Sequence, residues 1–379
     1  MVAIKGRKNS NKNPPIFSHE FMIQNHADIV SCIAMLFIIG LMVQTTSSWA
    51  YTFIVLHHNI STTTTNDLTA PIKYTIGWKD ACAVFFYLLV VIIMHAMFQE
   101  YIFDKISKRL HLSKVKLAKF NESSNLILFY LLSIFWGIDI IIRDNLLLNI
   151  SSLWMDYPTL LSFSLKFFFI GQLSYWLHFY PELYFQRVKK EDIAQRVIYI
   201  TIGLFFTFTA YFLNFQRVGI ILLVLHYTGD VLLHGARINH FVNHKVNRTR
   251  IWFLIANSVY VFVRIVSLVF TVVVFFYGFN QIESSFDYST GNFNIPIVQY
   301  TVLSVLVFFQ IYLLHKLVMR QIKRARENIT PVQNNKIKPK QKLKKKEGKK
   351  STLSEDDELP EVDQATKKNL RYRSFTKAK

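Results

Sequence analysis

Several features that would assign the chain to a familiar class are scarce or missing. Its 379 residues include only two cysteines, Cys32 and Cys82, too few for a small scaffold held by disulfide bonds. No glycine-rich phosphate loop, nucleophile elbow or Walker-type run occurs. Histidine boxes of the His-x-x-His-His type are missing too, and the pair His57-His58 falls in an expected loop. These absences argue against phosphate-cradling, serine-hydrolase and membrane di-iron chemistry.

Apolar residues, by contrast, are abundant and gathered into blocks. The chain is 51% hydrophobic and 15% aromatic, which excludes an intrinsically disordered protein. A soluble protein would spread these residues in periodic stripes, whereas here they fill blocks such as 29–43 and 167–177. The composition therefore predicts an all-α, polytopic membrane protein.

Eight stretches have about the length and apolar content that a helix needs to cross a bilayer. They are residues 29–49, 81–98, 126–142, 160–179, 197–213, 218–233, 251–279 and 295–314. Only residues 214–217 separate the fifth and sixth stretches. A tight helical hairpin explains that spacing most simply, and a re-entrant pair is the alternative.

The basic residues orient these spans. Residues 1–28, 99–125, 180–196 and 234–250 together hold eighteen Lys or Arg, whereas the loops on the opposite side hold four. By the positive-inside rule the first set is cytosolic, and both termini lie there with it. The basic N-terminal segment precedes an apolar run without a clear small-x-small cleavage site, so the first span is expected to be uncleaved.

The C-terminal segment has a different composition. From Lys316 onward the chain holds 20 Lys or Arg and 8 Asp or Glu, and residues 336–350 are almost free of apolar side chains. We expect a disordered cytosolic tail over 327–379. Its basic residues would bind anionic lipid headgroups or ribosomal RNA without sequence preference, and the sequence does not choose between the two.

One loop carries an expected modification site. Asn59 opens an Asn-Ile-Ser sequon in the first loop on the non-cytosolic side, where a luminal glycosyltransferase would reach it. Of the other sequons, those at Asn121, Asn247 and Asn328 fall on the expected cytosolic side and should stay unmodified.

Ionisable residues inside the spans need partners, because a charge in lipid costs several kcal/mol. A count of about 1.5 Å per residue places Asp139 and Lys166 at the same depth, which predicts an intramembrane ion pair between the third and fourth spans. Arg143, one turn beyond Asp139 and near the membrane surface, is the alternative partner for that carboxylate.

The sixth span is the most polar. His226, Asp230 and His234 recur every fourth residue and share one helix face. Arg264 is a candidate partner, although it counts as deeper in the membrane unless the seventh span enters later than Ile251. Three interpretations of this stripe compete. It binds a metal, it positions His226 as a general base, or it forms a polar seam between helices together with Gln172 and His178. We favour the seam.

Four segments resemble one family. They are residues 18–32 (Ser-His-Glu-Phe-Met-Ile-Gln-Asn-His-Ala-Asp-Ile-Val-Ser-Cys), 119–123 (Lys-Phe-Asn-Glu-Ser), 175–186 (Tyr-Trp-Leu-His-Phe-Tyr-Pro-Glu-Leu-Tyr-Phe-Gln) and 289–294 (Ser-Thr-Gly-Asn-Phe-Asn). They resemble the translocating chain-associating membrane proteins (TRAM) of the endoplasmic reticulum. Within the resemblance, residues 117–326 look like a helical TLC domain. The spans and charges divide the rest into a cytosolic N-terminus over 1–28, two spans with a glycosylatable luminal loop over 29–116, and the tail over 327–379.

The TLC domain is shared with ceramide synthases, but two of their features are altered. The segment from His226, His-Tyr-Thr-Gly-Asp-Val-Leu-Leu, resembles their His-Asp-x-x-Asp-x-x-Leu signature with Tyr227 in place of the first aspartate. Their adjacent histidine pair corresponds to residues 197–201, Val-Ile-Tyr-Ile-Thr. The resemblance thus implies a bundle that has lost the chemistry.

The function implied by the TRAM resemblance is that of an accessory, not an enzyme, and no cofactor is expected. Its partners would be the Sec translocation channel, nascent chains with their signal sequences, membrane lipids and, through the tail, the ribosome. The alternative is a sphingolipid-type enzyme or lipid carrier that uses His226 and Asp230.

Overall fold

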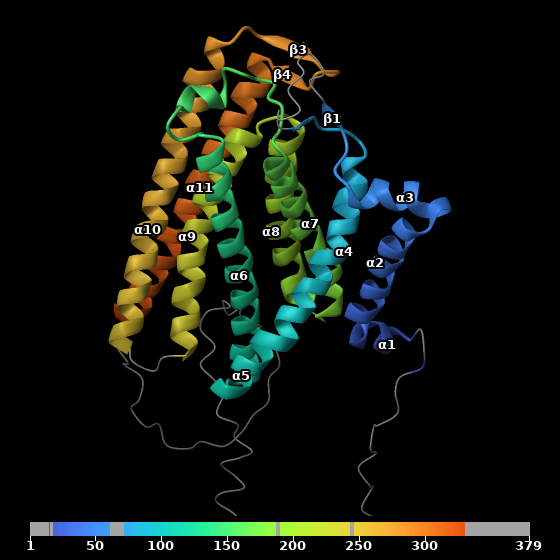
Figure 1. The fold of residues 1–379 in the computed structure, drawn as a ribbon. Coiled ribbons are helices and arrows are strands. Elements are labelled where there is room, and N and C mark those ends of the chain that lie inside the picture. The colour runs from blue at the N-terminus through green and yellow to red at the C-terminus, as the bar shows by residue number, and fades with distance from the viewer. Residues whose placement is uncertain (1–14, 16–17, 61–71, 187–189, 243–245, 330–379) are drawn as a thin grey trace, which may run out of the picture. The chain divides into compact units, whose positions relative to one another are not determined.

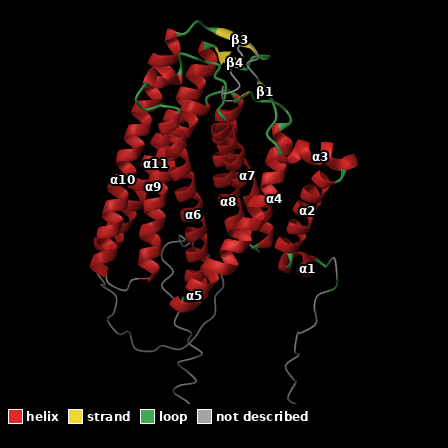
Figure 2. Cartoon of the chain, in the orientation of Figure 1, coloured by secondary structure: helices red, strands yellow, loops and turns green. Residues whose placement is uncertain are grey.

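Helices make up nearly all of the architecture (Figures 1 and 2). The computed structural model describes residues 15, 18–60, 72–186, 190–242 and 246–329. The tail expected over 327–379 lies outside these residues except for its first three positions, which end the last helix.

The long α-helices follow the apolar blocks of the sequence. The α-helices of the described residues are α1 (His19–Gln24), α2 (His26–Met42), α3 (Gln44–Ile54), α4 (Asp80–Phe98), α5 (Asp104–Leu110), α6 (Lys114–Arg143), α7 (Phe163–Phe185), α8 (Lys190–Phe212), α9 (Gln216–Val242), α10 (Val246–Val272) and α11 (Pro296–Ile329). Two short π-helices, η1 (Gln99–Phe103) and η3 (Val273–Gly278), continue α4 and α10.

Short turns and strands lie in the loops between the helices. The 3₁₀ turns are η2 (Ile150–Leu153) and η4 (Phe279–Gln281). Strands β1 (Asn59–Ile60) and β2 (Lys73–Tyr74) form one antiparallel hairpin, and β3 (Ser285–Asp287) and β4 (Asn292–Asn294) form another. The β3–β4 hairpin is tied to the bundle by Tyr157, whose hydroxyl accepts from the Phe293 N–H at 3.1 Å and donates to the Leu213 carbonyl at 2.7 Å.

The chain divides into two units. The larger holds residues 1–112 and 116–316, and the smaller holds 113–115 with 317–379. Within the larger unit the long helices run side by side, with the strands at one end and α1 and α5 at the other (Figure 1). Successive long helices reverse direction, as a multi-pass membrane protein requires.

In the described residues six helices are long and apolar enough to cross a membrane: 80–110, 116–143, 190–212, 216–242, 247–281 and 296–323. The expected hairpin of the fifth and sixth spans is confirmed by α8 and α9, joined through Asn214 in the left-handed conformation at φ 62°. The two remaining expected spans correspond to α2 and α7, and both differ from expectation.

The first span is interrupted. Instead of one helix over 29–49, α2 ends at Met42 and α3 begins at Gln44, because Val43 is extended at φ −100° and ψ 119°. The run that follows is rich in Thr and Ser, whose hydroxyls compete for backbone groups. The Thr46 hydroxyl donates to the Gly40 carbonyl at 2.9 Å, which satisfies an acceptor that a continuous helix would have paired with a backbone N–H.

The fourth span starts three residues later than expected and continues past Pro181. Ser162 caps α7 by accepting from the Leu165 N–H at 3.3 Å. Polar residues lower the hydropathy of α7, but the helix is surrounded by protein, and Lys166, Gln172, Ser174 and His178 are all buried. Its neighbours therefore supply the polar partners that lipid would lack.

Candidate intramembrane polar site

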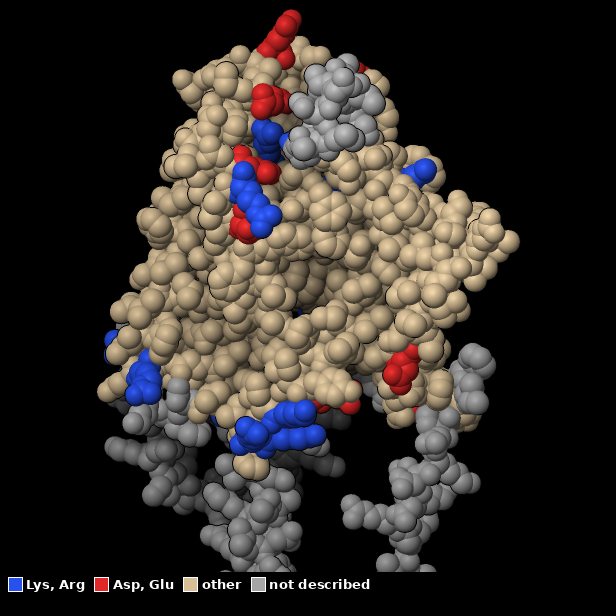
Figure 3. Space-filling view, viewed as in Figure 1, with Lys and Arg blue, Asp and Glu red and all other residues tan. Residues whose placement is uncertain are grey.

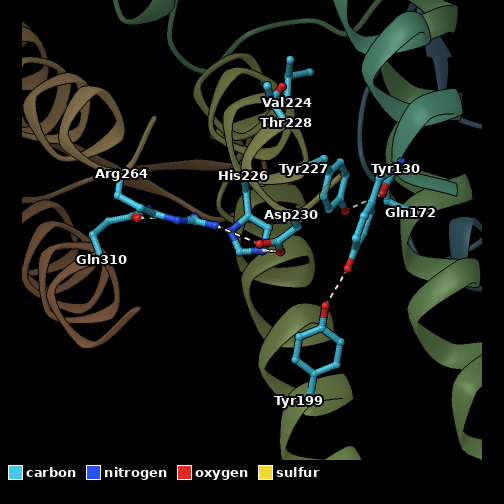
Figure 4. Close-up of polar contacts among 10 residues, drawn as sticks. All are labelled: Tyr130, Gln172, Tyr199, Val224, His226, Tyr227, Thr228, Asp230, Arg264 and Gln310. Atoms are coloured by element: carbon cyan, nitrogen blue, oxygen red, sulfur yellow. Dashed lines mark hydrogen bonds and ion pairs between the residues drawn. The ribbon is translucent and has the colours of Figure 1, made fainter. Parts of the chain in front are cut away.

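The centre of the site is a histidine and an aspartate on α9. His226 and Asp230 lie one turn apart, and His226 Nε2 is 3.1 Å from Asp230 Oδ2 (Figure 4). Arg264 reaches them from α10, with Nη1 2.6 Å from His226 Nδ1 and Nη2 3.4 Å from Asp230 Oδ1. Three side chains from two helices thus form one hydrogen-bonded cluster.

The geometry assigns the proton on His226. A guanidinium can only donate, so Nδ1 of His226 must be the acceptor and Nε2 must carry the hydrogen that faces Asp230. The imidazole is then neutral, and both of its nitrogens are engaged. In this arrangement neither nitrogen is free to take a proton from a substrate or to bind a metal ion.

Arg264 is the most deeply buried member of the cluster. It is fully buried, its guanidinium carbon lies 4.4 Å from the centre of the Tyr260 ring, and Gln310 of α11 accepts from Nη1 at 3.5 Å. The carboxylate of Asp230 supplies the opposite charge. His226 and Asp230 keep 20% and 15% of their side-chain surface accessible, whereas Arg264 keeps none.

Arg264 and His226 are closer in depth than the residue count predicts. Both helices extend beyond the apolar stretch, since α9 continues to Val242 and α10 already begins at Val246. Counted from these ends, His226 and Arg264 differ by two residues, or about 3 Å. The two side chains are therefore nearly level.

A second polar group lies on the other side of α9. Gln172 of α7 donates to the Ser133 hydroxyl at 2.9 Å and accepts from the Tyr227 hydroxyl at 2.7 Å. The hydroxyls of Tyr130 and Tyr199 are 2.5 Å apart, and the rings of Tyr130 and Tyr227 stack with centroids 4.8 Å apart. These phenols form a wall beside the Asp230 cluster (Figure 4). Figure 3 shows the surface hollowed between α4 and α6.

The expected six-residue groove is not one group, because Gln172 bonds to Ser133 and Tyr227 and His178 lies beside His95. His234 continues the α9 stripe one turn beyond Asp230 and lies 3.4 Å from the Ser123 hydroxyl of α6. His178 is fully buried between α4 and α7, where its ring lies 5.3 Å from that of His95, and His95 Nδ1 is 3.3 Å from Glu182 Oε1. Across the described ranges, no three His, Cys, Asp or Glu side chains form a group that could hold a metal ion.

Several residues that complete the two groups are not predicted by the sequence. Gln310, Ser133 and Tyr130 gave no signal, because neutral polar residues within apolar spans are common. In the sequence, Tyr199 and Tyr227 stand out only as departures from the ceramide synthase pattern. A tyrosine within an apolar stretch nevertheless needs a hydrogen-bond partner when it is buried.

The expected pair of Asp139 and Lys166 was wrong. Asp139 lies one turn from the end of α6, is partly exposed, and pairs with Arg143 on its own helix at 2.9 Å. Lys166 is in the first turn of α7 and reaches Asp80 at the start of α4, with Nζ 2.7 Å from Oδ1. Because α7 begins three residues later than expected, Lys166 lies nearer to the end of its helix than the residue count predicts.

Comparison with known proteins places the fold. The TLC domain family matches residues 119–319. Translocating chain-associated membrane protein 2 of Mus musculus is 42% identical over 318 residues, covering 83% of this chain and 85% of that protein, and its Homo sapiens counterpart is 41% identical over the same length. This chain belongs to the translocating chain-associated membrane protein (TRAM) family.

The TRAM chain also shows a more distant likeness to an enzyme family. It is 29% identical to ceramide synthase 4 of Mus musculus over 128 residues, which cover 34% of this chain and 32% of that protein. The structure shows what stands at the two altered positions. Tyr227 donates to Gln172 and Tyr199 bonds to Tyr130, so both are occupied by phenols in hydrogen-bonded contacts.

Proposed function

We propose that this protein is an accessory of protein translocation at the endoplasmic reticulum, which assists signal sequences and transmembrane segments of nascent chains as they enter lipid. The names of its relatives support the class, since they are translocating chain-associated proteins that match 83% of this chain. The structural observation that carries the proposal is the partly accessible cluster of His226, Asp230 and Arg264 inside the bundle.

The physical role follows from the cost of polarity in lipid. A charged residue at the centre of a membrane helix costs about 2.5–3.5 kcal/mol on the insertion scale. The carboxylate of Asp230 is partly accessible and has further lone pairs to offer a passing segment, while His226 and Arg264 hold it in place. Such partners would lower the barrier for marginally hydrophobic signals and have little to offer strongly hydrophobic ones.

Depleted microsomes provide the test. They are replenished with the wild-type protein or with Asp230→Leu/Arg264→Met, which removes both charges together and leaves neither buried alone. The matched control is Asp139→Leu/Arg143→Met, which removes an exposed pair from α6. We expect the first variant to lose the rescue of weak signal sequences and the control to keep it. Equal insertion of weak and strong signals with and without the protein would refute the function.

Orientation and partners belong to the same proposal. Both termini would be cytosolic, as the eighteen basic residues of residues 1–28, 99–125, 180–196 and 234–250 indicate against four on the other side. The Sec translocation channel and the nascent chain would lie beside the bundle, and the basic tail would meet ribosome or anionic lipid. Site-specific crosslinking from α9 and α10 during synthesis of a secretory chain tests these contacts.

A lipid-handling enzyme is the second candidate, favoured by the likeness to ceramide synthase 4 and by the retained pair of His226 and Asp230. The purified protein is incubated with an acyl-CoA and a sphingoid base, with His226→Ala as the comparison. Turnover by the wild type that disappears in His226→Ala would support the enzyme and refute the accessory role. No turnover by either protein would favour the accessory role.

A further inference from the structure

The largest blue patch at one end of the molecule in Figure 3 lies at α5, outside the TLC domain and away from the polar site. Helix α5 carries Lys105, Lys108 and Arg109, and all three are exposed. These residues belong to the basic segment 99–125 that orients the spans, but no binding partner has been assigned to them so far. What they contact at the membrane is a separate question.

The continuous segment of η1 and α5 has three stripes. Phe103 and Ser107, one turn apart, are buried and face the bundle. Ile102 and Ile106 form an exposed apolar stripe, at 41% and 43% of their surface. The third stripe is formed by Tyr101, Lys105 and Arg109, which follow one another at intervals of one helical turn. An exposed apolar stripe next to a basic one is the pattern of a helix at the boundary of acyl chains and headgroups.

The segment is held in a fixed position. The π-helix η1 redirects the chain between α4 and α5. Gln99 donates to Asp104 Oδ1 at 2.6 Å and accepts from the Asn125 side chain of α6 at 3.1 Å, which ties the bend to the bundle. Lys105 Nζ lies 5.6 Å from the centre of the Tyr101 ring, so the ammonium is directed along the basic stripe.

We propose that the exposed surface of η1 and α5, formed by Tyr101, Ile102, Lys105, Ile106, Lys108 and Arg109, binds anionic phospholipid headgroups of the adjacent leaflet. The three cations match phosphate, and the two isoleucines enter the acyl region beside them. RNA would satisfy the cations alone and leave Ile102 and Ile106 in water. Lipid accounts for both stripes, and RNA for one.

Nanodiscs test the proposal with the full chain. The protein is reconstituted in phosphatidylcholine alone and in an equal mixture of phosphatidylcholine and phosphatidylserine, and the phosphatidylserine retained on extraction is measured by native mass spectrometry. Each near-surface basic residue strengthens association about fivefold. We therefore expect Lys105→Gln/Lys108→Gln/Arg109→Gln to lose most of the phosphatidylserine enrichment. The matched control is Arg237→Gln/Arg248→Gln/Arg250→Gln, which removes the same charge from α9 and α10 and should lose less of the enrichment.

Two further arms decide between explanations. Ile102→Ser/Ile106→Ser keeps every charge, so reduced enrichment in this variant supports the membrane and unchanged enrichment removes the apolar stripe from the proposal. Amine labelling of the wild type should show Lys105 and Lys108 protected by phosphatidylserine, a readout that needs no variant to fold. Equal loss in both triple variants, or loss of binding to purified ribosomes by the α5 triple with lipid enrichment intact, would overturn the proposal.

Discussion

Lys166 Nζ lies 2.7 Å from Asp80 Oδ1, a contact that joins the first turn of α7 in the TLC domain to the first turn of α4 outside it. The ammonium also donates to the carbonyls of His57 and Thr75 at 2.8 and 2.7 Å. The other carboxylate oxygen of Asp80 accepts from the Tyr211 hydroxyl at 2.8 Å. Because these hydrogen bonds satisfy both buried charges, the pair fixes the β1–β2 hairpin against the bundle.

Asp80→Asn should therefore be strongly destabilising. The substitution leaves Lys166 buried with a full charge and no counter-ion, which costs about 3–5 kcal/mol. Asp139→Asn breaks an exposed pair of the same type and should cost about 0–1 kcal/mol. Thermal unfolding in detergent compares the two. Similar melting temperatures for both variants would contradict the assignment of Asp80 as the partner.

Two glycines in the TLC helices should respond oppositely to alanine. A Cβ on Gly203 of α8 would lie 2.6 Å from the Trp176 ring of α7, so Gly203→Ala forces the helices apart and should cost about 1–3 kcal/mol. Nothing lies within 4 Å of the corresponding position at Gly235 of α9. Gly235→Ala should be neutral or stabilise by up to about 1 kcal/mol through helix propensity. Detergent melting curves of the two variants check this, and equal destabilisation would show that α8 and Trp176 are not in close contact.

The two sequons on the side of the strands should differ in modification. Asn59 is exposed in β1, seventeen positions beyond the end of α2, whereas Asn149 follows the end of α6 by six positions and is flanked by the exposed Leu147 and Leu148. A sugar acceptor has to stand clear of the membrane, so we expect one glycan, on Asn59. Endoglycosidase digestion should shift the wild type and Asn149→Gln and leave Asn59→Gln unchanged. A shift that survives in Asn59→Gln would reverse the predicted orientation or add a second site.

The loop after α3 should loosen in acid. Burial lowers the pKa of His58, with the nearby charge of Asp80 opposing and that of Lys166 adding to the effect. The folded loop therefore favours the neutral ring, and its stability is present above the ordinary pKa of about 6.5 and is lost as pH falls through the lower folded value. The Thr75 N–H, which donates to the His58 carbonyl at 2.9 Å, reports this through hydrogen exchange.

His58→Asn is the control for this pH dependence. His58 is in the left-handed region at φ 62°, which asparagine tolerates, and asparagine does not titrate near neutral pH. Exchange at Thr75 should then be independent of pH between about 5 and 7 once the intrinsic rate is removed. An unchanged pH dependence in this variant would mean that another group controls the loop.

Much of this protein is determined by its sequence alone. Apolar blocks of membrane length define six of the helices, because a backbone in lipid must satisfy its own hydrogen bonds. The pairs on one helix were also readable, since residues four apart share a face: His226 with Asp230, and Asp139 with Arg143 as the alternative partner.

Only the tertiary structure decided which charges meet between helices. Lys166 pairs with Asp80, not with Asp139, and Arg264 pairs with His226. Each contact depends on where a helix begins, how far it extends past the apolar stretch and which helix lies next to it. A shift of three residues at the start of α7 changes depth by about 4.5 Å, more than the reach of a hydrogen bond. Periodicity fixes the face of a helix, but the pairing of buried charges is decided by packing.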